Sequence, residues 1–261
     1  MYRRVPTRKV LLTALLVALV CSAVVTVSTV MLRPVQEQNR QAYMKKNILK
    51  VAGLWQRGQR LETQLQQLET RLVELASGRF VEAEDAAAYD HVAAARDPAR
   101  SIALSPQQDI AGIRRRAHHA AVYLTRDEQG AIQSLVLPVY GYGLWSTLYG
   151  FIALEADTRT VIGLRFYEHG ETPGLGGEVD NRRWLAKWQG KQVFDANWRP
   201  TIKLVKGGID RGSADAKHQV DAISGASLTN RGIENLIRFW LGDDGFGPFL
   251  MLVRETGGRY D

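Results

Sequence analysis

The chain has 261 residues, of which 45% are hydrophobic, so it is long and apolar enough to bury a sizeable core, and this composition argues against disorder. The net charge of +7 comes largely from the first 32 positions, which hold four basic residues and no acids, whereas the remainder has 30 basic and 27 acidic residues. A body so close to neutral, without a run of basic residues interleaved with aromatics, excludes a nucleic-acid partner as the working hypothesis.

Residues 10–32 form an uncharged apolar run, VLLTALLVALVCSAVVTVSTVML, which is long enough to span a bilayer because about 20 such residues suffice. A cleaved secretory signal would have an apolar region of about 7 to 15 residues followed by a small-residue cleavage site. We therefore predict a retained transmembrane helix over 10–32 and a basic cytoplasmic tip over 1–9. The tip is acid-free, which favours a cytoplasmic N-terminus and an exported body; its basic residues are Arg3, Arg4, Arg8 and Lys9.

Residues 33–100 are predicted to be mainly helical. Leucines recur at alternating steps of four and three, the spacing of one helix face, at Leu61, Leu65, Leu68, Leu72 and Leu75. The repeat covers only about two heptads, fewer than a coiled coil needs, so we expect an amphipathic helix packed on the domain or on partner subunits. The Ala-rich stretch 81–101 predicts further helix or loop.

Short runs of β-branched and aromatic residues fill 131–169, separated by the turn-forming sequences GYG and ADTRT, and predict consecutive antiparallel strands. TIKLV at 201–205 and FLMLVRE at 249–255 also resemble strands. Two helices are predicted from apolar faces, which consist of Trp184, Leu185 and Trp188 in the first and Ile233, Leu236, Ile237, Trp240 and Leu241 in the second. The predicted fold class is α+β, with an antiparallel sheet and flanking helices after a single N-terminal transmembrane helix.

Two polar, glycine-containing segments interrupt this pattern: HGETPGLGGEV at 169–179 and DAISGASLTN at 221–230. Taken singly, the first could be a long turn and the second a helix cap with spare hydroxyls. Together they suggest a backbone that comes close to a flat or phosphorylated ligand. Glycines remove side chains that would hold such a ligand away, and a helix start offers free N–H groups to a phosphate.

These two segments and GLWSTLYG at 143–150 resemble the NqrC family, the flavin-carrying subunits of the Na+-translocating NADH:quinone reductases, over essentially the whole chain. The family's flavinylation signature is D-x-x-[ST]-G-A-T. Its last threonine holds FMN through a phosphoester, which a dedicated Mg-dependent flavin transferase installs from FAD. The matching position in this sequence is Ser227, a serine where the family has threonine, and both residues offer an alcohol oxygen.

The resemblance also implies how a flavin-binding domain at 101–261 would hold the cofactor. Trp145 would cover one face of the flavin ring, although by composition alone it is as easily a core residue. Lys206 could add positive charge near the phosphate, Asp221 would present the hydroxyl site, and Thr229 is an alternative acceptor two residues beyond the motif. No catalytic residue or metal ligand is predicted, and the cofactor-binding residues are Trp145, Thr172, Gly174, Leu175, Gly176, Lys206, Asp221, Ser224, Gly225, Ala226, Ser227 and Thr229.

The function that the resemblance implies is electron carriage. A covalent FMN would relay electrons towards ubiquinone within a complex of the bacterial inner membrane that expels Na+, with the main domain on the periplasmic side. Expected partners are the other membrane subunits of the complex and, during maturation, the flavin transferase. Three alternatives stay open: the flavin subunit of the related ferredoxin:NAD oxidoreductase complex, a membrane-anchored non-redox flavin-binding adaptor, and a structural membrane subunit. The long segment 36–55 after the span favours the quinone reductase over the first.

Overall fold

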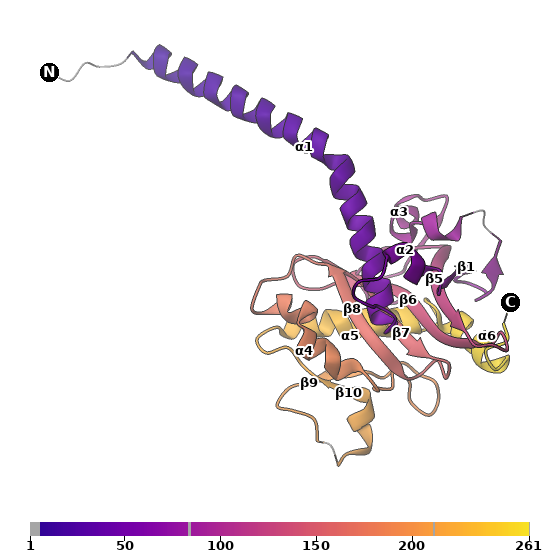
Figure 1. Ribbon diagram of the computed structural model, residues 1–261. Helices are drawn as coiled ribbons and strands as arrows, with labels where there is room; N and C mark the ends of the chain where they lie inside the picture. Colours follow the sequence, from indigo (N-terminus) through magenta and orange to yellow (C-terminus); the bar gives the residue numbers. More distant parts are fainter. Residues whose placement is uncertain (1–5, 83–84, 211, 261) are drawn as a thin grey trace. The chain divides into compact units, whose positions relative to one another are not determined.

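The structure is a computed structural model that describes residues 6–82, 85–210 and 212–260 (Figure 1). Its contacts divide the chain into two units, Met1–Met44 and Lys45–Asp261, which are treated separately below. The predicted basic tip lies partly outside the described residues, because these begin at Pro6 and so leave out Arg3 and Arg4.

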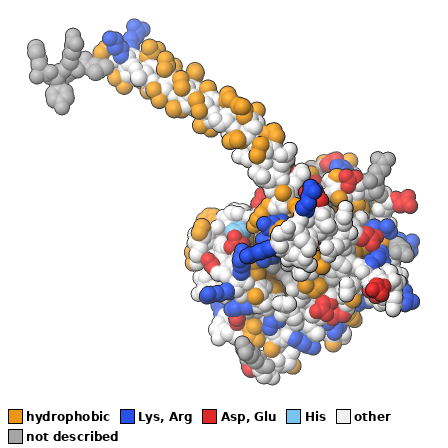
Figure 2. Space-filling view, in the orientation of Figure 1, with side chains coloured by type: hydrophobic (Ala, Val, Ile, Leu, Met, Phe, Trp, Pro, Cys, Tyr) orange, Lys and Arg blue, Asp and Glu red, His pale blue; other side chains and the backbone are white. Residues whose placement is uncertain are grey.

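The first unit consists of the greater part of helix α1 (Thr7–Val51), which contains the predicted span 10–32. Within the described residues, this helix is the one whose length and composition would allow it to cross a membrane, and none of its most apolar window is buried. Figure 2 shows hydrophobic side chains covering it. At 1.5 Å per residue, 23 residues extend about 34 Å, which matches a hydrocarbon layer of about 30 Å.

The second unit is built on a six-stranded sheet with the order β2-β1-β5-β6-β7-β8, in which every neighbouring pair is antiparallel. The predicted antiparallel sheet is thereby confirmed. Its strands are β1 (Glu69–Glu74), β2 (Phe80–Val81), β5 (His119–Arg126), β6 (Ile132–Tyr142), β7 (Thr147–Glu155) and β8 (Val161–Glu168).

Two small sheets and several short helices complete this unit. The strands β3 (Ser101–Ala103) and β4 (Arg115–Ala117) pair antiparallel, and β9 (Lys203–Val205) and β10 (Gln219–Asp221) pair parallel. The α-helices are α2 (Leu61–Leu65), α3 (His91–Arg96), α4 (Arg182–Leu185), α5 (Ser227–Leu241) and α6 (Gly247–Glu255). The 3-10 helices are η1 (Ala86–Ala88), η2 (Gly176–Asp180), η3 (Ala186–Trp188) and η4 (Ala214–His218).

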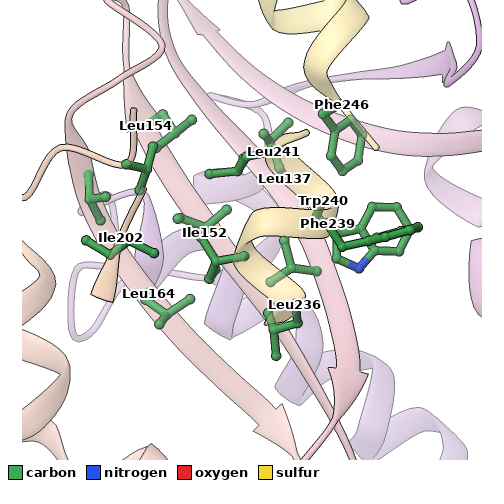
Figure 3. Packing of buried hydrophobic residues seen from close by; sticks show 14 of the residues in the cluster. Leu137, Ile152, Leu154, Leu164, Ile202, Leu236, Phe239, Trp240, Leu241 and Phe246 are labelled. Atoms are coloured by element: carbon green, nitrogen blue, oxygen red, sulfur yellow. The ribbon is translucent and has the colours of Figure 1, made fainter. Parts of the chain in front are cut away.

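Helix α5 packs on β6 and buries the apolar stripe predicted for it, so that prediction is confirmed. Leu236 and Trp240 lie against core residues of the sheet such as Leu137 and Ile152 (Figure 3). The indole N–H of Trp240 donates a hydrogen bond of 2.6 Å to the carbonyl of Tyr140. The far end of α5 is therefore fixed to the sheet by apolar burial together with a satisfied polar group.

The helix predicted from the leucine repeat is wrong beyond Leu65, where α2 ends. The later leucines belong to β1 and its flanks, and both Leu72 and its neighbour Val73 are buried. A strand that is buried on both faces does not show alternating polarity, so its leucines could match a helical spacing by chance. The short helices η1 and α3 agree with the prediction of helix or loop for the Ala-rich stretch 81–101.

The strand predicted at 249–255 is also wrong, because this segment lies in α6. Pro248 sits in the first turn, where a proline favours helix initiation, and the buried positions Phe249, Leu250 and Val253 follow a helical spacing. A short apolar run cannot be assigned to helix or strand by periodicity alone, which explains the error.

We predict that Gly232→Ala destabilises the protein by about 1 to 3 kcal/mol, although alanine favours a helix. An added Cβ at Gly232 would clash with the carbonyl oxygen of Tyr142 and would lie 3.0 Å from Cα of Gly143, both backbone atoms that cannot rotate away. Urea unfolding measures the effect. Arg231→Ala, at the exposed neighbouring position in α5, is the control and should change stability by less than about 0.5 kcal/mol. An alanine variant at 232 as stable as the parent would contradict the close contact.

Candidate functional site

The hydroxyl-rich segment forms the entrance to α5, with Ser227 as the first helical residue and exposed to solvent. The preceding N-cap, Ala226, provides no side-chain hydrogen bond, so the N–H groups of the first turn are not capped by a side chain. The buried amide of Asn230 fixes the loop, because it accepts from the N–H of Ile223 at 3.0 Å and donates to its carbonyl at 2.8 Å. The Ser227 hydroxyl is thus presented from a rigid turn at the positive end of a helix.

The glycine-rich segment 169–179 lies directly beside this turn. Gly225 has a φ of +72°, and an added Cβ there would lie 2.9 Å from Cδ2 of Leu175. An added Cβ at Gly176 would lie 2.6 Å from Oγ1 of Thr229 and 2.7 Å from Oε2 of Glu171. Glycine is therefore needed at both positions for the two segments to approach each other so closely.

The carboxylate of Glu171 joins three segments of the site and is only 5% exposed. Its Oε1 accepts hydrogen bonds from the backbone N–H groups of Leu144, Trp145 and Ser146 at 3.0, 3.0 and 3.3 Å. Its Oε2 accepts from the buried hydroxyl of Thr229, two residues into α5 after Ser227, at 2.7 Å. We refer to these four hydrogen bonds as the Glu171 clamp.

The pKa of Glu171 lies below its ordinary value. Burial acts to raise this pKa, but the N–H of Trp145, the hydroxyl of Thr229 and the N–H groups of Leu144 and Ser146 all stabilise the charged form and together outweigh burial. The clamp is therefore built around a carboxylate anion at neutral pH.

Three large apolar side chains stand exposed around the turn that carries Ser227. Trp145 is 66% exposed, Leu175 46% and Leu228 51%. They come from the β6–β7 hairpin, the glycine-rich segment and the first turn of α5. We call these three residues the apolar rim. Exposed apolar groups gathered in this way suit a flat aromatic ligand, which would cover them.

Lys206 and Asp221 lie at the carboxyl ends of two paired strands. The parallel pairing of β9 and β10 sets Val205 opposite Asp221, and the N–H of Ala222 donates to the Val205 carbonyl at 2.8 Å. Lys206 is exposed and follows directly. Asp221 accepts from Nζ of Lys187 at 2.8 Å through its side chain, and its backbone carbonyl accepts from the indole of Trp184 at 2.9 Å.

The structure places the remaining predicted site residues in different surroundings. Thr172, Gly174 and Ser224 are exposed, and the Thr172 carbonyl accepts from the N–H groups of Leu175 and Gly177 at 3.1 and 2.8 Å, which closes the glycine-rich turn. Gly176, Ala226 and Thr229 are buried, so they support the surface instead of facing it. Trp145 is not a core residue, because its indole is exposed to solvent. Only its backbone N–H takes part in the Glu171 clamp.

Sequence reasoning missed Glu171 and Asn230, although both lie inside the two segments that it selected. The available signal was an acid in a glycine-rich turn and an amide after a run of hydroxyls. Among residues 6–82, 85–210 and 212–260, no group of three or more His, Cys, Asp and Glu side chains could hold a metal ion.

The segments that form this site lie within a region that is similar to a known domain family. The model of the FMN-binding domain family matches residues 143–242, which include the turn between β6 and β7, strand β7, the glycine-rich segment and all of α5.

Two relatives are similar over almost the whole chain, and both are named as the C subunit of the Na(+)-translocating NADH-quinone reductase. The protein from Pseudomonas aeruginosa is 47% identical over 253 residues, which cover 95% of this chain and 97% of the relative. The protein from Yersinia pestis is 48% identical over 252 residues, which cover 95% of this chain and 93% of the relative.

Two solved structures are similar in fold. NqrC from Shewanella oneidensis has a TM-score of 0.77 at 36% identity, with 84% of this chain and 99% of that chain covered. The C subunit of the Na(+)-translocating NADH-quinone reductase from Parabacteroides distasonis has a TM-score of 0.64 at 28% identity, with 84% and 96% covered. The likeness bears out the predicted α+β fold class.

We predict that Glu171→Gln lowers the free energy of unfolding at pH 7 by about 1.5 to 3 kcal/mol, because neutral acceptors form weaker hydrogen bonds than a carboxylate. The pKa of Glu171 is lower in the folded state than in the unfolded chain, so the clamp's contribution is present above the unfolded value of about 4.3 and is lost as the pH falls through the folded pKa. The difference between parent and variant, measured by urea unfolding from pH 7 to pH 3, should therefore shrink on acidification.

The exposed carboxylate of Glu255 on α6 provides the control. Glu255→Gln should change the free energy of unfolding by less than about 0.5 kcal/mol. A parent-to-variant difference for Glu171 that grows as the pH falls would be incompatible with a clamp that works through the charged carboxylate.

Proposed function

The chain belongs to the NqrC family of the Na(+)-translocating NADH-quinone reductases, and from this we propose that Ser227 carries FMN on the apolar rim. As a member, it is an FMN-carrying electron-transfer subunit of this oxidoreductase. The observation that supports Ser227 is an exposed alcohol at an uncapped helix start, flanked by exposed Trp145 and Leu175. FMN supplies the redox chemistry when bound, and the protein holds it and sets its surroundings.

The proposed attachment needs little from the chain besides a placed oxygen. The Ser227 hydroxyl would lose its proton and form a phosphoester with the FMN half of FAD, and AMP would leave. The phosphodiester keeps one negative charge, which the N–H groups of the first turn and the dipole of α5 would stabilise by roughly 0.3 to 1 kcal/mol. Lys206, at the end of β9, would add a point charge of the same sign as the helix end.

The surroundings of the hydroxyls favour Ser227 over Thr229 as the acceptor. The Thr229 side chain is fully buried, and its hydroxyl donates to Glu171. Esterification there would break the Glu171 clamp and would force a phosphate into a space already filled. Ser224 is exposed, but it lies three residues before the helix and therefore away from the N–H groups of its first turn.

The apolar rim accounts for the other contacts that we propose. A flavin ring tethered at Ser227 would cover Trp145 and Leu175, which would otherwise remain in water, at about 25 cal/mol for each Å² of apolar surface removed. Thr172 and Gly174 lie on the exposed side of the same glycine-rich turn and would border the ring. We retain 101–261 as the proposed flavin-binding domain, within which the family match 143–242 falls.

The protein belongs to a complex built from several subunits, and its N-terminal helix is consistent with a single-pass membrane anchor. We propose further that the helix crosses the bacterial inner membrane with the main domain in the periplasm, that the other membrane subunits and the flavin transferase are its partners, and that the electrons pass towards ubiquinone. The names of the relatives favour the quinone reductase over the ferredoxin:NAD oxidoreductase complex.

We predict that Ser227→Ala abolishes covalent FMN, whereas Ser227→Thr retains it, when each full-length variant is produced together with the flavin transferase. The tryptic peptide His218–Arg231 should gain the mass of FMN less one water in the parent and in Ser227→Thr only. Ser77→Ala, at an exposed position in the turn after β1 and outside the flavinylation signature, serves as the control and should stay yellow after denaturation. Bound colour that survives denaturation in Ser227→Ala would show that another residue is the acceptor.

We predict that a membrane-impermeant maleimide labels Glu128→Cys in spheroplasts whose inner membrane is intact, but labels Arg8→Cys only after the spheroplasts are lysed. Both positions are exposed, one in the turn after β5 and the other near the start of α1. Replacement of the native Cys21 by serine removes the background signal. The reverse labelling pattern would place the main domain in the cytoplasm.

A further inference from the structure

The Glu171 carboxylate lies close to the backbone of all three residues of the apolar rim. It binds the backbone N–H of Trp145, it lies beside Gly176, which follows Leu175, and it binds Thr229, which follows Leu228. Its carboxylate is hydrogen-bonded to two of these segments, the hairpin and α5, and Glu171 itself belongs to the third. A buried charge therefore stands immediately behind the surface on which the flavin is proposed to rest.

This charge is not neutralised by a cation. Among the residues that the structure describes, no Lys, Arg or His side chain lies within ion-pair distance of Glu171, and its four hydrogen-bond donors are neutral groups. Neutral hydrogen-bond donors stabilise the carboxylate, but they do not cancel its negative charge. Because Glu171 is buried, water screens this charge only weakly. A negative potential should therefore reach the apolar rim.

We infer that Glu171 is a positioning residue that also lowers the reduction potential of the flavin, through its buried negative charge. This inference rests on the proposed attachment at Ser227. Reduction adds electrons to the flavin ring, and a fixed negative charge nearby disfavours the added negative charge whenever protons do not follow completely. The same field leaves the uncharged oxidised ring unaffected, so the effect favours a carrier that gives up its electrons readily.

The Thr229 hydroxyl allows the electrostatic role of Glu171 to be distinguished from a purely structural one, because the two roles predict different directions for the shift in flavin potential. The hydroxyl donates to Oε2, so it partly compensates the charge. Its removal in Thr229→Val leaves the carboxylate less compensated and should lower the flavin potential. Glu171→Gln removes the charge, can keep Oε1 as acceptor for the three N–H groups, and should raise the potential. A loosened rim alone would shift both variants in the same direction.

The test is a spectroelectrochemical titration at pH 7.5 of full-length protein, produced with the flavin transferase, for the parent, Glu171→Gln, Thr229→Val and Thr229→Ser. We expect the midpoint potential to become more positive in Glu171→Gln and more negative in Thr229→Val. Thr229→Ser keeps the hydroxyl and should match the parent. Urea unfolding of the same samples should show a loss of stability in both Glu171→Gln and Thr229→Val, so stability and potential would separate.

Shifts of the same sign in the two variants, or an unchanged potential in Glu171→Gln, would overturn the inference. If Glu171→Gln does not fold, the comparison of Thr229→Val with Thr229→Ser decides, because equal potentials in these two would also overturn it. Parent protein that is colourless after denaturation would overturn the proposed attachment at Ser227 and this inference with it. Yellow parent protein without opposite shifts would overturn the inference alone.

Discussion

The arrangement of the site depends on one carboxylate and its four hydrogen bonds. Glu171 receives three backbone N–H groups from the hairpin after β6 and one hydroxyl from α5, and it belongs itself to the glycine-rich segment. A buried carboxylate without these donors would be strongly unfavourable, so each segment is needed to make the position of the others stable. The buried Glu171 clamp consequently fixes the positions of the segments that form the exposed surface around Ser227.

Helix α5 connects this clamp with the core. At its far end, Trp240 packs among core side chains (Figure 3). The Trp240 indole donates to the Tyr140 carbonyl, and at the near end of the helix the Thr229 hydroxyl donates to Glu171. Between them, Gly232 allows the helix backbone to touch the hairpin at Tyr142. Ser227 therefore starts a helix that is fixed at both ends, and a cofactor held there would keep a defined position. Such a position is what electron transfer between carriers requires.

The parts that the sequence allowed us to predict are those with a local pattern. The apolar stripe of α5 and the alternating strands after Ala131 repeat with the periods of helix and strand. The glycine-rich and hydroxyl-rich segments have compositions typical of turns and of helix starts. β1 and α6 were misassigned because a doubly buried strand and a short apolar run have no distinctive period. The clamp could not be predicted, because Glu171 and Thr229 are 58 positions apart and no local pattern joins them.

The same geometry explains how a serine can stand where the family signature has a threonine. Ser227 is exposed at the first position of α5, whereas the hydroxyl that is buried and shared with Glu171 belongs to Thr229. Because position 227 is exposed, the absence of the methyl group leaves no cavity in the core. For the attachment that we propose, the fold needs to place one alcohol oxygen beside the N–H groups of the first turn of α5, and both serine and threonine carry such an oxygen.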